Sequence, residues 1–136
     1  MTNNKKIEWI LRIGVAGEFL GHGVLAVGGK EDWITWIERL SGLDTATATT
    51  FIMVVGAVDI LLALLVLVKP IKPVLLWMTF WGFWTALVRP LVHWPIFDTP
   101  ENLVSIWGFV ERFANWAAPL ALFFLLKNRG ESNNNN

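Results

Sequence analysis

The sequence contains no cysteine and no tyrosine, and only 16% of its 136 residues are charged. Without cysteine, the chain has no means to form a disulfide, a thiolate metal site, an iron–sulfur cluster or a cysteine nucleophile. Lys plus Arg equals Asp plus Glu at 11 each, so no basic surface points to a nucleic-acid partner. Soluble domains carry roughly 25% charged residues. The low charge, with 54% hydrophobic residues and nine tryptophans, indicates a protein whose main partner is the lipid bilayer.

Long apolar stretches alternate with short polar connections along the chain. Each stretch has about the 20 residues that a helix needs to cross a bilayer. We therefore predict an all-α fold, an integral membrane four-helix bundle, as a single transmembrane domain over residues 7–127. A cytoplasmic N-terminus (1–6) precedes it, and a disordered polar tail (128–136) follows. The predicted spans cover about residues 7–27, 48–68, 73–95 and 101–126.

The placement of basic residues predicts the orientation of the bundle. If there are four spans, one end of the bundle holds Lys5, Lys6, Lys69, Lys72, Lys127 and Arg129. The opposite loops hold only Lys30 and Arg39 among several Asp and Glu residues. Because positive charge concentrates in cytoplasmic loops, both termini are expected in the cytoplasm of a multi-pass inner-membrane protein.

The first external loop has a helical pattern of its own. Trp33, Trp36, Ile37, Leu40 and Leu43 share one face at helical spacing. This pattern predicts a short interfacial helix in the outer headgroup layer, ended by the glycine at position 42. A loop anchored at the interface by two tryptophans is the alternative.

Ionisable residues inside the predicted spans are the main functional signal, because each is costly in the bilayer unless it is paired. We predict a polar pocket inside the bundle, near the outer leaflet, lined by Glu18, His22, Asp59, Arg89, His93, Glu111 and Arg112. The alternative is that these charges neutralise one another and fix helix register, a role favoured for Arg12 and Arg112. Arg89-Pro90 is expected to break or kink the third span, and Gly17-x-x-x-Gly21 is expected to allow close helix approach.

The two histidines and a tryptophan row suggest more specific chemistry. A haem held by His22 and His93 is a weak alternative, and no metal site is expected. We favour a packed His22 imidazole bonded to Glu18 or to a backbone carbonyl. Trp77, Trp81 and Trp84 follow one side of the third span and could stack on a quinone ring, although such surfaces more often face lipid or pack in the bundle.

Short motifs over about residues 10–126 resemble the DoxX-like family of small four-span bacterial membrane proteins. The motifs are Leu11-Arg12-Ile13-Gly14, Phe19, His22-Gly23, Leu40-Ser41-Gly42-Leu43, and the run from Val55 to Leu62 that contains Asp59. The resemblance implies a bacterial inner-membrane protein, in some members associated with quinone-linked respiration.

We therefore expect an accessory or quinone-linked redox subunit, in which Asp59 or Glu18 exchanges the quinone proton. A membrane or peripheral redox partner would supply electrons, and a homo-oligomer is compatible with the sequence. The alternatives are a non-enzymatic scaffold or assembly subunit, or a small-solute permease. The absence of polar side chains over Ile60–Val68 argues against a pore.

Overall fold

The computed structural model describes residues 2–95 and 98–134, and every regular element in that part of the chain is an α-helix. The helices are α1 (Asn3–Val27), α2 (Glu31–Ser41), α3 (Thr45–Val68), α4 (Lys72–Val92), α5 (Pro100–Val110) and α6 (Phe113–Asn134). Within the described ranges, four stretches are long and apolar enough to cross a membrane: Asn3–Val27, Thr45–Val68, Lys72–Val92 and Asn102–Gly130. The prediction of an all-helical chain with four candidate spans is confirmed.

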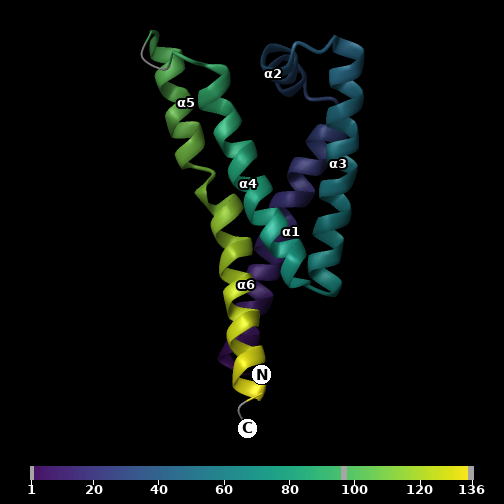
Figure 1. The fold of residues 1–136 in the computed structure, drawn as a ribbon, viewed down its shortest axis with the longest axis vertical. Coiled ribbons are helices and arrows are strands. Elements are labelled where there is room, and N and C mark those ends of the chain that lie inside the picture. Colours follow the sequence, from purple (N-terminus) through teal and green to yellow (C-terminus); the bar gives the residue numbers. More distant parts are fainter. Residues whose placement is uncertain (1, 96–97, 135–136) are drawn as a thin grey trace.

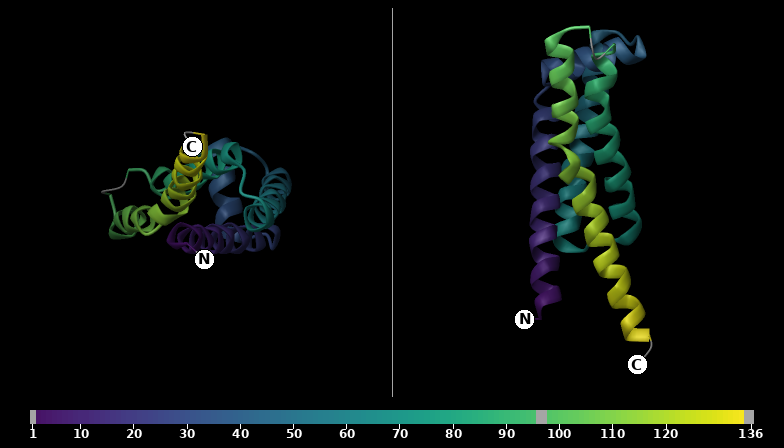
Figure 2. Two further views of the ribbon diagram at one scale, coloured as in Figure 1. Left: turned by 90° about the horizontal axis from the view of Figure 1, so that it is seen from below. Right: turned by 90° about the vertical axis from the view of Figure 1, so that its left-hand side faces the viewer.

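The two ends of the molecule differ in character. Both termini lie at one end, and α2 lies across the opposite end (Figures 1 and 2). From their short connection near the first of these ends, α3 and α4 diverge toward α2 (Figure 1). This divergence leaves room for a cavity beside α2.

A reciprocal glycine contact joins α1 to α3. A Cβ on Gly23 would lie 2.7 Å from the backbone oxygen of Gly56, and a Cβ on Gly56 would lie 2.6 Å from the backbone oxygen of Gly23. Only glycine fits both positions. The expected close approach at Gly17 and Gly21 is wrong within this chain, because a Cβ at either residue meets no atom within 4 Å.

Arg12 makes a second contact between α1 and α3, near the start of α1 and the end of α3. Its side chain is buried, and its Nε donates a hydrogen bond of 2.9 Å to the carbonyl of Val66. A second guanidinium nitrogen donates to the carbonyl of Leu67, and Glu8 lies 3.4 Å away. Arg12 therefore satisfies carbonyls in the last turn of α3, which agrees with the structural role expected for it.

The amphipathic pattern of the first connection forms a helix, as expected. Gly42 follows α2 in the left-handed conformation (φ +71°), where glycine is favoured. Trp33 is buried and packs in a small apolar cluster with Ala26 of α1 and Ile52 of α3. The apolar face of α2 thus covers the end of the α1–α3 pair.

Several boundaries differ from the sequence prediction. The fourth span is present as Asn102–Gly130 but contains a turn at Glu111 and Arg112, between α5 and α6. The third span is not broken at Arg89-Pro90, because α4 continues through both residues and ends at Val92. The segment expected to be disordered from 128 is helical through Asn134.

Candidate functional site

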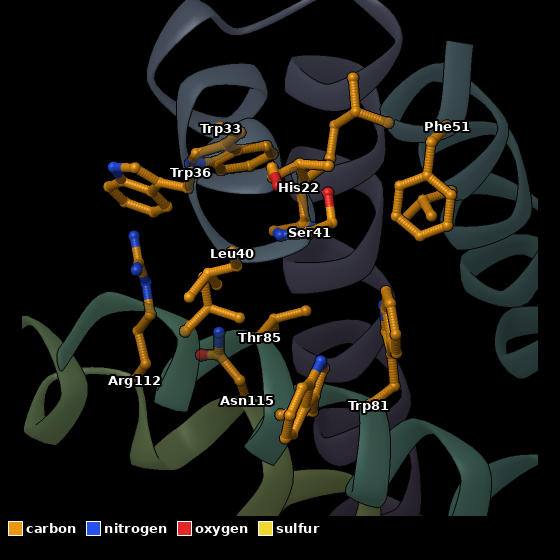
Figure 3. Close-up of a pocket in the computed structure, with 15 residues that line it drawn as sticks. His22, Trp33, Trp36, Leu40, Ser41, Phe51, Trp81, Thr85, Arg112 and Asn115 are labelled. Carbon is orange, nitrogen blue, oxygen red and sulfur yellow. Dashed lines mark hydrogen bonds between the residues drawn. The ribbon is translucent and has the colours of Figure 1, made fainter. Parts of the chain in front are cut away.

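A cavity of about 270 Å³ lies between α2 and the diverging helices (Figure 3). Five of its side chains are aromatic rings: Trp33 and Trp36 from α2, Phe51 from α3, and Trp81 and Trp84 from α4. The volume is near the lower limit for small-molecule sites. The remaining lining residues are His22, Ile37, Leu40, Ser41, Ile52, Val55, Thr85, Val88, Arg112 and Asn115.

His22, which lines this cavity, is hydrogen-bonded to the buried Asp59 carboxylate. Nδ1 of His22 lies 2.7 Å from Oδ2 of Asp59, whose side chain is 2% exposed. The imidazole also stacks on Trp33, with ring centroids 4.4 Å apart. The expected partner of His22, Glu18 or a backbone carbonyl, is therefore wrong. Asp59 on the neighbouring α3 takes that position.

A second, much smaller cavity lies next to the first. It measures about 10 Å³ and is lined by Glu18, Phe19, His22, Asp59, Trp81, Gly82, Thr85 and Asn115. His22, Trp81, Thr85 and Asn115 line both cavities. Glu18, Asp59 and His22 of the predicted polar pocket therefore come together here.

The turn between α5 and α6 adds two polar side chains to the large cavity. Arg112 lies in the turn itself and Asn115 lies in the first turn of α6. Figure 3 shows the Arg112 side chain directed toward Trp36, with the Asn115 amide nearer the middle of the cavity. In the described part of the chain, neither side chain has a hydrogen bond or an ion pair within 4 Å.

Three of the predicted pocket residues lie elsewhere. Arg89 and Glu111 form an ion pair of 3.6 Å, and the Arg89 guanidinium lies 5.6 Å from the centre of the Trp36 ring. Nδ1 of His93 lies 2.8 Å from the backbone carbonyl of Arg89, which accepts its hydrogen bond. None of Arg89, Glu111 or His93 lines either cavity.

The predicted tryptophan row divides in the same way. Trp81 and Trp84 line the large cavity, whereas Trp77 stacks on Trp81 from outside it, with centroids 5.9 Å apart and planes 11° apart. Sequence reasoning missed Thr85 and Asn115 as site residues. Thr85 follows Gly82 by three residues and precedes Arg89 by four, and this helical spacing places its hydroxyl on the same side of α4 as the Arg89 side chain. That spacing was the available signal in the sequence.

Neither a cluster of metal ligands nor a similarity to known proteins assigns chemistry to the cavity. No group of three or more His, Asp or Glu residues that could hold a metal occurs within residues 2–95 and 98–134. No family model, curated protein or solved structure matches the chain. A functional assignment must therefore come from the geometry of the cavity.

Proposed function

We propose that the protein binds a membrane quinone in the large cavity and acts as a quinone-linked accessory subunit of a redox system. The observation that carries this proposal is an aromatic cavity lined by His22, whose imidazole is held by the buried Asp59 carboxylate behind it. Flat apolar rings stack well on aromatic side chains. The resemblance to the DoxX-like family is consistent with the proposal.

The position of the exposed aromatic residues suits a ligand that arrives from the lipid. Phe51 and Trp84 line the cavity from α3 and α4, and they are 48% and 43% exposed. Because α3 and α4 diverge at this end (Figure 1), a hydrophobic ring could pass between the two side chains without entering water. Membrane quinones are hydrophobic ring compounds that reside in the lipid, so they suit this route of entry.

The His22–Asp59 hydrogen bond provides a group for proton exchange. When Nδ1–H of His22 donates to the Asp59 carboxylate, the lone pair on Nε2 is free to accept a proton from a ligand hydroxyl. The Asp59 carboxylate then stabilises the imidazolium that forms. A membrane or peripheral redox partner would supply the electrons when the quinone is reduced and would receive them when the quinol gives up its proton to His22, because the chain itself has no evident redox group.

We further propose a placement in the bacterial inner membrane. The end that carries both termini also carries Lys5, Lys6, Lys69 and Lys72, which supports a cytoplasmic location for this end. The amphipathic α2 at the opposite end would lie in the outer interface, beside the cavity.

Native mass spectrometry of the protein in mild detergent tests the binding proposal. We expect a stoichiometric quinone mass on the wild type. Arg89→Ala should retain this mass, because Arg89 does not line the cavity. Asp59→Asn should lose roughly tenfold in occupancy, because the variant removes the anionic partner that orients His22. Folding of all three proteins is checked by helical circular dichroism.

A scaffold or assembly subunit is the second candidate, favoured by the outward face of α1. Gly14, Gly17 and Gly21 are exposed there, and a Cβ on any of them meets no atom within 4 Å. Such a face suits close packing of another helix, including α1 of a second copy. If all three proteins carry only lipid or a partner subunit, equally retained, the quinone proposal is wrong and this candidate takes its place.

A further inference from the structure

The interruption between α5 and α6 gives the large cavity a cationic end. Arg112 occupies the two-residue turn, and Asn115 follows it by three residues at the start of α6. Both line the cavity, and Asn115 is only 9% exposed. The guanidinium and the side-chain amide together present several N–H donors to the cavity.

The charge of Arg112 is not compensated by a close partner. Arg89 repels the charge of Arg112, and the carboxylates that attract it are Glu111 and Glu18. Glu111 is paired with Arg89, and in the described part of the chain no carboxylate lies within 4 Å of the Arg112 guanidinium. A guanidinium at membrane depth is costly unless an anion or hydrogen-bond acceptors approach it.

The other residues that line the cavity supply no carboxylate to pair with the Arg112 guanidinium. Its other walls are mostly aromatic and aliphatic. Among the described residues that line it, His22 alone is paired with a carboxylate, that of Asp59. The hydroxyl groups of Ser41 and Thr85 already donate to the backbone carbonyls of Ile37 and Gly82. A ligand must therefore supply the acceptor that Arg112 and Asn115 lack.

We propose that Arg112 and Asn115 make the site selective for ring compounds that carry an ionised oxygen. The inference rests on the proposed function, since it concerns the same cavity, and it narrows the ligand class. The oxyanion accepts charge-assisted hydrogen bonds from Arg112 and Asn115, while the ring packs against the tryptophans. Such hydrogen bonds are about twice as strong as neutral ones.

A matched pair of ligands tests this selectivity. The probes are 2-hydroxy-1,4-naphthoquinone, used at a pH where its hydroxyl is ionised, and its 2-methoxy analogue, which has no ionisable group. Dissociation constants are measured by tryptophan quenching with the full-length protein in nanodiscs. The variants are Arg112→Gln and, as control, Arg39→Gln, whose side chain is exposed on α2 and lies outside the cavity.

We expect the wild type to bind the ionised compound at least about tenfold more tightly than the methyl ether. This preference should persist in Arg39→Gln and disappear in Arg112→Gln. Equal binding of both compounds by the wild type, or a preference that survives in Arg112→Gln, would overturn the inference and leave the proposed function standing. If the wild type binds neither compound, both proposals fail. The wild-type comparison needs no variant, so it stands even if Arg112→Gln does not fold.

Discussion

His22 and Asp59 join the last turns of α1 to the middle of α3 through a contact of 2.7 Å between Nδ1 and Oδ2. The Asp59 side chain is nearly inaccessible, and His22 also lines the large cavity. A carboxylate buried inside a bundle is normally paired or used in chemistry. The pair therefore links the packing of the two helices to the wall of the candidate site.

The Gly23–Gly56 contact predicts a large difference between two glycine substitutions. Gly56→Ala should lower the free energy of unfolding by about 1–3 kcal/mol, because its methyl group would overlap the α1 backbone. Gly17→Ala is the matched control and should be neutral within about 0.5 kcal/mol for the monomer. Unfolding in mixed micelles measures both. Equal effects would contradict the α1–α3 packing described here.

Arg12 predicts a stability effect at the opposite end of the same helix pair. Arg12→Met leaves the carbonyls of Val66 and Leu67 without its hydrogen bonds and should cost about 1–3 kcal/mol. Lys5→Met, an exposed cation at the same end, should change stability little. The same unfolding assay compares them. A similar small effect for both would show that the buried guanidinium is dispensable.

Asp44 predicts a pH dependence at the start of α3. The hydroxyl and backbone N–H of Thr47 donate to its carboxylate, which holds the pKa of Asp44 below the ordinary value of 3.8. A carboxylate with a lowered pKa stabilises the fold above its unfolded pKa and loses that contribution as the pH falls through its folded pKa.

The stability of the wild type should therefore fall relative to Asp44→Asn as the pH drops from about 6 to about 3. Asparagine is the matched variant because it caps a helix and does not titrate in this range. Melting temperatures of the two proteins across that range provide the measurement. A constant difference between them would exclude a contribution of the ionised Asp44 carboxylate to stability.

The absence of native cysteine makes the proposed orientation directly measurable. Lys69→Cys, in the connection between α3 and α4, should react with a membrane-impermeant thiol reagent only after cells are lysed. Thr45→Cys, at the α2 end of α3, should react in intact spheroplasts. The reverse pattern would place the termini outside and contradict the proposal.

Much of the fold could be predicted from the sequence because hydrophobic length and periodicity are local properties. The four spans required only runs of about 20 apolar residues. The position of α2 and its end at Gly42 required only helical spacing and a glycine. The break at Glu111 and Arg112 gave no such signal, since neither residue is a helix breaker and the two side chains have different tertiary surroundings.

The candidate site was predicted in part for a related reason. Helical spacing placed Glu18 and His22 on one side of α1, but it could not show that Asp59 reaches His22. That contact depends on the register between α1 and α3, which Gly23 and Gly56 set. The position of Arg89, Glu111 and His93 outside both cavities likewise depends on how α4 and α5 pack, which one sequence does not reveal.

The central claim is that the large cavity holds the ring of a quinone, and a volume-filling variant tests it most directly. Val55 lines the cavity, whereas the adjacent Val54 is 58% exposed and lies outside it. Binding of a short-chain quinone to protein in nanodiscs is measured for the wild type, Val55→Trp and Val54→Trp. We predict equal affinity for the wild type and Val54→Trp, and at least a roughly tenfold loss for Val55→Trp. Undiminished binding by a folded Val55→Trp protein would show that the quinone does not occupy this cavity.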